Sequence, residues 1–287
     1  MRKTIIGIAL ASFAIGLLLA GPIAMAIWLL TATFFGLREY YDIHKSNSIR
    51  PLPLLGVPLG CSFIILALLS IYLDGKILGP QAYLLIIVSI VLGSLVYQFC
   101  YAARGKKSIT TAEISVTLFG SVYVGGLLSF ILLVWGLGIQ YFPGDMVKIN
   151  LCVFLPFWAA YGSDSAAFLV GSKFGKHKMF PRVSPNKTIE GSLGALTFCV
   201  VGTVVAGSFL GYSIPALIGI GLVAGIASQV GDHCESVFKR EHEVKDSGST
   251  FGKTHGGFLD KMDSIVFTLP VYYYFLYLCR PPLASGG

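Results

Sequence analysis

Residues 192–231 read SLGALTFCVVGTVVAGSFLGYSIPALIGIGLVAGIASQVG and contain no Asp, Glu, Lys or Arg. A helix needs about 20 apolar residues to cross the hydrocarbon core of a bilayer, so this stretch is long enough to cross it twice. We predict one span over 192–211 and a second over 213–231. Polar loops at 171–191 and 231–263 bound the stretch on its two sides. The stretch therefore predicts an integral membrane protein with its polar chemistry at the ends of its spans.

Apolar runs of similar length recur along the whole chain. Hydrophobic residues make up 55% of the 287 residues and charged residues only 12%, about half of the charged fraction of a typical soluble domain. This composition excludes an ordinary soluble domain and predicts an all-α polytopic membrane protein with about nine transmembrane helices. The nine runs lie near residues 4–20, 21–37, 52–73, 80–102, 112–137, 149–172, 192–211, 213–231 and 264–279.

Lysine and arginine are distributed unevenly between the two sides that nine spans create. With the N-terminus inside, three of the 21 basic residues (Lys76, Lys148 and Arg280) fall outside, which leaves 18 inside. Loops rich in these residues stay in the cytoplasm. We therefore predict a protein of the cell inner membrane whose N-terminus and two polar loops are cytoplasmic. The same asymmetry explains the net charge of +7 by attraction to anionic lipid headgroups, without nucleic acid.

The acidic residues divide the chain into two regions of one membrane domain. Five of the 14 acids precede residue 150 and the other nine follow it. We interpret residues 1–150 as an N-terminal transmembrane scaffold region. Residues 151–287 are the catalytic transmembrane region, with the cytoplasmic loops 171–191 and 231–263. The six cysteines have no paired spacing, so neither a zinc site nor a disulfide framework is indicated.

Four aspartates stand within or next to apolar runs. Asp164 lies inside the sixth run, where an unpaired carboxylate costs several kcal/mol, and we favour a functional role for it over a buried structural ion pair. Asp232 directly follows the eighth run. Asp260 and Asp263 precede the ninth, three residues apart on one helical face. Such oxygen ligands suit Mg²⁺ or Mn²⁺ rather than zinc, so we expect these four residues to form a metal site.

A magnesium site in turn suggests phosphate groups, for which nearby basic residues and glycine backbone N–H groups could be donors. If the eighth span continues as a helix past Gly231, then Ser236 and Lys239 or Arg240 share a face with Asp232. The remaining charges of the second loop are assigned to a solvated face: Glu235, Glu241, His242, Glu243 and Lys253.

The second loop resembles the signature of the phosphatidate cytidylyltransferases, also called CDP-diglyceride synthetases. The residues that carry the resemblance occur in the family's order: Ser236, Lys239-Arg240, Lys245-Asp246, His255-Gly256-Gly257, Asp260 and Asp263. Others are Gly231-Asp232, Ser184-Pro185, Lys187-Thr188 and Glu190-Gly191, and in the N-terminal half the Glu39-Tyr40 pair. Lys261 stands where the family has arginine. Either Lys253 acts with Lys261 on one polyphosphate, or Lys253 is a solvated loop charge.

The resemblance implies transfer of a cytidylyl group from CTP to phosphatidate, which gives CDP-diacylglycerol and diphosphate in phospholipid biosynthesis. It implies Mg²⁺ or Mn²⁺ as the cofactor. The implied partners are CTP, a phosphatidic-acid-type lipid and the bilayer, with no nucleic acid and with a homodimer as one permitted assembly. The implied catalytic residues are Asp232, Lys245, Asp246, His255 and Asp260. The implied substrate-binding residues are Lys173, Ser184, Lys187, Thr188, Ser236, Lys239, Arg240, Gly256 and Gly257.

Two other functions stay open. One is a CTP-dependent enzyme that acts on another acceptor, such as an ether lipid, an isoprenoid lipid or a prenol. The other is a transporter in which Asp164 and glycine-broken spans line a substrate path. The transporter is less favoured because the two loops carry more paired charge than connectors require, and because the sequence contains no recognisable inverted repeat.

Overall fold

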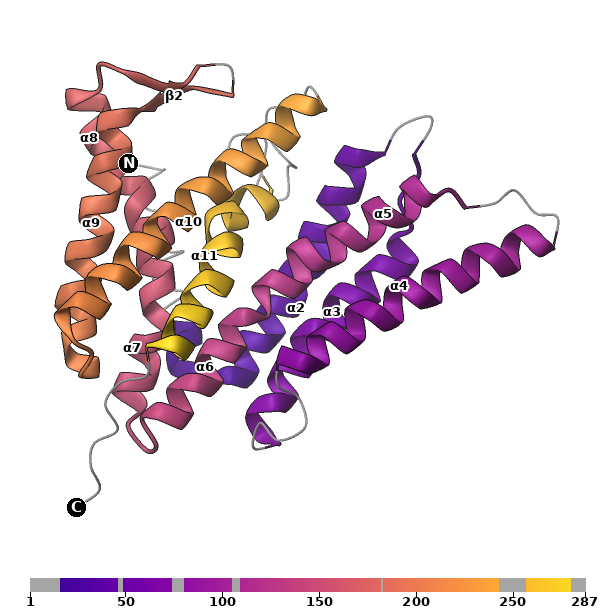
Figure 1. Cartoon of the computed structure of the whole chain (residues 1–287), viewed down its shortest axis with the longest axis horizontal. Coiled ribbons are helices and arrows are strands. Elements are labelled where there is room, and N and C mark those ends of the chain that lie inside the picture. The colour runs from indigo at the N-terminus through magenta and orange to yellow at the C-terminus, as the bar shows by residue number, and fades with distance from the viewer. Residues whose placement is uncertain are drawn as a thin grey trace.

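The computed structural model describes residues 16–45, 49–73, 80–104, 109–181, 183–242 and 257–279, which form helices and one short β hairpin (Figure 1). In chain order the elements are α2 (Pro22–His44), α3 (Pro53–Tyr72), α4 (Pro80–Ala103), α5 (Thr111–Gly120), η1 (Ser121–Gly126), α6 (Phe130–Tyr141), α7 (Met146–Phe157), η2 (Trp158–Gly162), α8 (Ser163–Phe174), β1 (Lys178–Phe180), β2 (Ser184–Thr188), α9 (Ile189–Gly207), η3 (Ser208–Leu210), α10 (Ile214–Glu241) and α11 (Leu259–Leu278).

Five helical stretches within the described ranges are long and apolar enough to cross a membrane. They are Pro53–Tyr72, Thr111–Tyr141, Met146–Phe174, Ile189–Leu210 and Ile214–Glu241. The all-α membrane fold is therefore confirmed, whereas the count of nine spans is not. The predicted runs 21–37, 80–102 and 264–279 fall in α2, α4 and α11, and most of run 4–20 lies outside the described residues.

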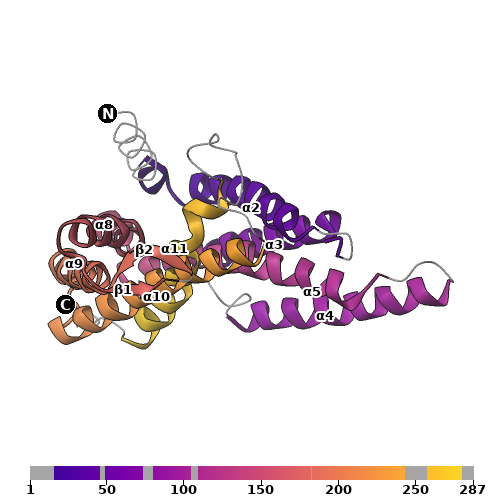
Figure 2. The same ribbon diagram turned by 90° about the horizontal axis from the view of Figure 1, so that it is seen from above.

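Two helices, α10 and α11, pass through the middle of the molecule and join its two sides. The helices α2 to α6 lie on one side of this pair, and α7, α8 and α9 lie on the other (Figures 1 and 2). The hydrophobic core contains residues of both sides, including Trp135 of α6 and Ile149 of α7, together with Tyr272 of α11 between them. The Tyr272 hydroxyl donates a hydrogen bond to the backbone oxygen of Cys152 in α7 at 3.0 Å, which satisfies this polar group inside the core.

Glycines of α10 allow this helix to approach both α9 and α11 closely. A Cβ atom at Gly221 of α10 would lie 2.7 Å from the Cα atom of Val200 in α9. A Cβ atom at Gly231 would lie 2.4 Å from the backbone oxygen of Asp263 in α11. Small residues at such contacts are typical of helices that pack within membranes. The contact at Gly231 places the polar ends of α10 and α11 side by side.

The first predicted polar loop, 171–191, contains regular structure. The strands β1 and β2 form an antiparallel hairpin between α8 and α9, with Lys178 opposite Thr188 and Phe180 opposite Ser184. The Thr188 side chain caps α9 by accepting a hydrogen bond from the N–H of Gly191 at 3.2 Å. The hairpin is therefore joined directly to the first turn of α9 and stands at the end of the bundle where α10 ends and α11 begins (Figure 1).

Candidate active site

Helix α10 continues past Gly231 to Glu241. This continuation is the condition under which Asp232, Ser236 and Lys239 were predicted to share one helical face. The N-terminal turns of α11 lie against this part of α10. The polar residues of both helices therefore meet at the hairpin end of the bundle. Two groups of charged side chains occupy this region, one around Asp232 and one around Glu235.

The first group, which we term the aspartate cluster, consists of Asp164 in α8, Asp232 in α10 and Asp263 in α11. Asp232 lies close enough to the other two carboxylates for their negative charges to interact. Ser264 bridges two members, because its Oγ donates to Asp164 Oδ2 at 3.4 Å and its N–H donates to Asp263 Oδ1 at 2.7 Å. The Lys187 ammonium of β2 forms an ion pair with Asp232. Three carboxylates beside one paired ammonium favour the addition of a cation.

The aspartate cluster is not a preassembled metal site. Among the described residues, no three His, Cys, Asp or Glu side chains are placed so as to hold a metal ion together. Asp260, the fourth predicted ligand, pairs instead with a lysine of the second group. The four-residue metal site and its Mg²⁺ or Mn²⁺ ion stay predictions.

The second group consists of Glu235, Lys239 and Asp260. The Lys239 ammonium pairs with the Glu235 carboxylate one helical turn earlier and lies 3.0 Å from Asp260 Oδ1. Glu235 is fully buried, so its assignment to a solvated face was wrong. The charge pattern alone did not reveal this burial, because Glu235 is buried only where α11 covers the side of α10 that carries it. Buried carboxylates require a partner, and Lys239 is that partner here.

The other predicted substrate-binding residues lie at several places around these groups. Ser236 is partly buried on α10, and Ser184 is partly buried in β2. Lys173, in the last turn of α8, and Lys261 are exposed. The Arg240 side chain reaches the hairpin, where its Nε donates to the Val183 oxygen at 3.4 Å. Six residues of the second polar loop that are named above lie outside the described residues: Glu243, Lys245, Asp246, Lys253, His255 and Gly256.

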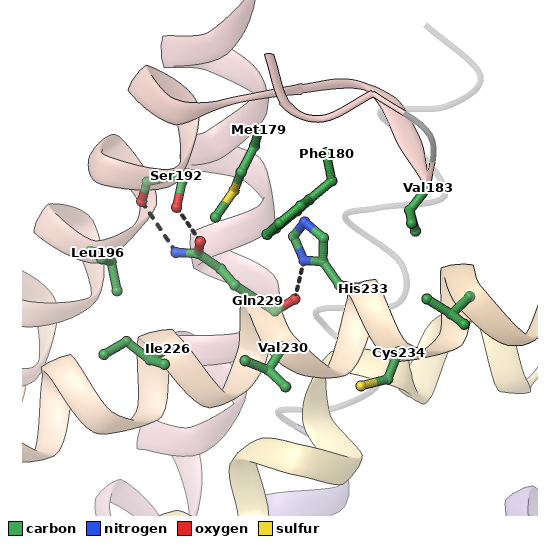
Figure 3. A pocket seen from close by; sticks show the side chains of 11 residues that line it. Met179, Phe180, Val183, Ser192, Leu196, Ile226, Gln229, Val230, His233 and Cys234 are labelled. Atoms are coloured by element: carbon green, nitrogen blue, oxygen red, sulfur yellow. Dashed lines mark hydrogen bonds between the residues drawn. The ribbon is translucent and has the colours of Figure 1, made fainter. Parts of the chain in front are cut away.

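An open groove of about 470 Å³ lies between the hairpin, α9 and α10 (Figure 3). The side chains of Met179 and Phe180 line it from the hairpin side, and Ile226, Val230 and Val237 line it from α10. The groove is therefore mainly apolar. The groove shares α10 and the hairpin with the aspartate cluster, because the lining residue His233 directly follows Asp232 on α10 and because Lys187, the partner of Asp232, belongs to the hairpin.

Polar groups in the groove mostly bond to one another. Ser192 Oγ donates to Gln229 Oε1, and Gln229 Nε2 donates to the backbone oxygen of Ser192 at 3.2 Å. The Nδ1 atom of His233 donates to the backbone oxygen of Gln229, and its ring meets the Phe180 ring edge to face with centroids 5.0 Å apart (Figure 3). Apart from His233 Nε2, which makes no hydrogen bond within the described residues, these polar atoms are satisfied, so the groove suits an apolar chain better than a polar ligand.

Sequence reasoning gave no role to three residues that the structure places in or beside this region: Gln229, His233 and Glu39. Gln229 and His233 are polar residues near the end of an apolar run. Their position was the feature of the sequence that could have indicated a functional role. Glu39 was noted only within the family resemblance, although it is a carboxylate close to the end of the second apolar run. In the structure it accepts a hydrogen bond from the N–H of Leu259, the first residue of α11.

Comparison with known proteins agrees with the resemblance. The model of the cytidylyltransferase family matches residues 1–279. A Synechocystis protein named phosphatidate cytidylyltransferase is 30% identical over 301 aligned positions, which cover 98% of this chain and 97% of that protein. Proteins of the same name from Bacillus subtilis and Staphylococcus aureus are 32% identical over 193 and 195 positions, which cover 67% of this chain and 68% and 70% of those proteins. The chain thus belongs to the cytidylyltransferase family and is a membrane-bound nucleotidyltransferase.

Proposed function

We propose that this chain is a phosphatidate cytidylyltransferase, which converts CTP and phosphatidate into CDP-diacylglycerol and diphosphate. The observation that carries the proposal is an apolar groove built on the same helix and hairpin, α10 and β1–β2, as a cluster of carboxylates and basic residues, in a chain of this family. A lipid phosphate requires both features, because its acyl chains need an apolar surface and its headgroup needs positive charge. The names of the relatives support phosphatidate as the acceptor.

In the proposed reaction an oxygen of the lipid phosphate attacks the α-phosphorus of CTP. A new P–O bond forms, the bond between the α- and β-phosphates breaks, and diphosphate leaves with the electron pair of that bond. The attacking oxygen is already anionic, so no strong general base is needed. Catalysis would rest on alignment of the two phosphates and on stabilisation of negative charge.

The residues of the site fit these tasks. Lys187 and Asp232 are each about one quarter exposed, at 28% and 25% of their side-chain surface, so a substrate phosphate can reach the lysine. Arg240 lies at the edge of the groove and can contact a headgroup. The oxygen donors of Asp164, Asp232 and Asp263 suit Mg²⁺ or Mn²⁺, and their mutual repulsion favours a divalent ion. Such an ion would neutralise phosphate charge and orient the oxygens for in-line displacement.

Labelled CTP incubated with the purified protein in lipid–detergent micelles tests the function. We expect formation of a CDP-lipid with phosphatidate, loss of activity with a chelator, and recovery with Mg²⁺ or Mn²⁺. Ether lipid phosphates, isoprenyl phosphates and prenols serve as parallel acceptors. Labelled product with one of these and none with phosphatidate would contradict the proposal. A protein that transfers no label but moves a solute across vesicles would be a transporter.

We predict that Ile226→Trp impairs binding of the lipid substrate, because the indole fills the groove in which we propose that an acyl chain lies. The KM for phosphatidate should rise by about tenfold, which corresponds to about 1.4 kcal/mol of lost binding. The KM for CTP should stay unchanged. Steady-state kinetics in mixed micelles with each substrate varied in turn gives both values.

The matched control is Val205→Trp on α9, because Val205 is exposed to a similar extent, 62% against 51% for Ile226, and does not line the groove. Its kinetics should resemble those of the wild type. An unchanged KM for phosphatidate in Ile226→Trp would exclude the groove as the acyl-chain site. A rise in the KM for CTP alone would place the nucleoside there instead.

We also propose a multi-pass topology with the N-terminus and both polar loops in the cytoplasm of the inner membrane. This topology places 18 of the 21 basic residues on the cytoplasmic side, which supports it, because loops rich in lysine and arginine stay in the cytoplasm. The three exceptions are Lys76, Lys148 and Arg280. A reporter enzyme that is active only outside the cytoplasm should be inactive when fused after Arg182 and active when fused after Lys148. The reverse result would overturn the orientation.

A further inference from the structure

Helix α11 begins without a cap from its own sequence. Its N-cap residue is Phe258, and no side-chain capping hydrogen bond is made by that residue. The first N–H groups of any helix lack partners within the helix, and buried N–H groups without partners are costly. The start of α11 therefore depends on an acceptor from elsewhere in the molecule.

Helix α2, more than 200 residues earlier, supplies that acceptor. Glu39 Oε2 accepts a hydrogen bond from the N–H of Leu259 at 3.0 Å, and the Glu39 residue is only 8% exposed. One turn earlier on α2, the Phe35 ring stacks on the Phe258 ring with centroids 5.4 Å apart and an interplanar angle of 9°. A carboxylate at this position also complements the positive end of the helix dipole. Two contacts of different kinds thus fix the segment 257–259 against α2.

Gly257 shows how closely the two segments approach. A Cβ atom at this position would lie 2.2 Å from Glu39 Oε2 and 2.4 Å from its Cδ, which is closer than real Cβ atoms come to other atoms. Glycine is therefore required at position 257 as long as Glu39 keeps its place. This requirement explains in steric terms why the last residue of the His-Gly-Gly motif has no side chain.

The same segment determines the position of a predicted catalytic residue. The N–H of Gly257 donates to Asp260 Oδ2 at 2.7 Å, and the other carboxylate oxygen, Oδ1, lies 3.0 Å from the Lys239 ammonium. A shift of Gly257 would therefore move one partner of Asp260 while the other stayed on α10. Glu39 is linked to Asp260 through the backbone of residues 257–260 and does not need to touch substrate.

We propose that Glu39 is a positioning residue of the active site, which holds the start of α11 so that Asp260 faces Lys239 and the substrate phosphates. The proposal rests on the proposed function. It assigns an active-site role to the N-terminal region, which the sequence indicated only as a scaffold. Glu39→Gln keeps an oxygen that can accept the Leu259 N–H but loses the charge, whereas Glu39→Ala loses both.

The test combines kinetics with hydrogen exchange on the full-length protein in micelles. Glu39→Ala should lower kcat by about 10- to 100-fold, the range expected for residues that orient catalytic groups, and leave the KM for phosphatidate unchanged. Glu39→Gln should lose less. The backbone amides of 257–262 should exchange faster in Glu39→Ala than in the wild type.

Glu113→Gln is the matched control. Glu113 also accepts a hydrogen bond at a helix N-terminus, from the Thr110 N–H at 2.8 Å, but it belongs to α5.

Gly257→Ala supplies an independent variant. Alone it should lower kcat, because its methyl group collides with the Glu39 carboxylate. Combined with Glu39→Ala, which removes that carboxylate, it should cause no further loss, so the two effects should be strongly non-additive. Additive losses, or a Glu39→Ala protein with wild-type kcat, would overturn the proposal. Unchanged hydrogen exchange at residues 257–262 in Glu39→Ala would also overturn the proposal. The exchange measurement does not depend on the identity of the substrate. A wild-type protein that fails to use phosphatidate would therefore refute the proposed function and leave the role of Glu39 to be decided by the exchange rates.

Discussion

Asp232→Asn should abolish cytidylyl transfer while leaving the protein folded. Asp232 interacts with the charges of both other members of the aspartate cluster and pairs with Lys187. A neutral amide is a poor ligand for a hard divalent cation and does not hold the lysine by charge. We expect turnover to fall by more than about 100-fold, comparable with the removal of one strong electrostatic contact from an active site. Product formation from labelled CTP measures the loss.

Asp145→Asn is the matched control for this substitution. Asp145 caps α7 by accepting a hydrogen bond from the Lys148 N–H at 3.0 Å, far from the aspartate cluster in the fold. Asparagine is also a good N-cap residue, so this variant should retain wild-type activity and thermal stability. Full turnover by Asp232→Asn would remove the hypothesis of a metal held by Asp232. A thermal midpoint well below that of the wild type would instead assign Asp232 a structural role.

Lys239→Met should destabilise the protein strongly. The substitution leaves Glu235 fully buried without its counterion and removes a partner of Asp260. Loss of one partner from a buried ion pair costs about 3–5 kcal/mol in the free energy of unfolding. Thermal unfolding in detergent micelles, followed by circular dichroism or by precipitation, should show a clearly lower midpoint.

The matched control for Lys239→Met is Lys148→Met. Lys148 pairs with Asp145, an acid three residues away on the same helix turn, but the two side chains are 43% and 41% exposed. Solvent screens pairs exposed to this extent, and they add little to stability, so the midpoint should change little. The double variant Glu235→Gln/Lys239→Met removes the unpaired charge and should recover part of the lost stability. Equal midpoints for Lys239→Met and the wild type would mean that Glu235 is neutral in the folded protein.

Much of the fold could be predicted because hydropathy is a local property of the chain. A run such as 192–231 has no charged residue for water to solvate, so a bilayer-spanning helical structure is the stable arrangement whatever else the protein contains. The order of residues in the second polar loop was sufficient to indicate the protein family. The aspartates were found for the same reason, since a carboxylate beside an apolar run is costly unless it has a purpose.

The environment of individual charges could not be predicted in this way. Glu235 and Asp232 are three residues apart in one charged segment, yet Glu235 is buried beneath α11 while Asp232 remains partly exposed beside the hairpin. The difference depends on the rotation of α10 about its axis and on the helix that covers each side. The sequence shows a glycine at position 231, but it does not show that this glycine lies against the backbone of Asp263 and lets α11 approach α10 closely.

By itself, the sequence determined the membrane fold, the family and the set of acids and bases from which the site is built, because each follows from local composition and residue order. Only the tertiary structure decided which of these groups meet. Leu259 and Glu39 are separated by 220 residues, and no pattern within either segment indicates their hydrogen bond. Pairs of this kind arise when helices distant in sequence pack together, since packing must satisfy the polar groups that each helix leaves without a partner.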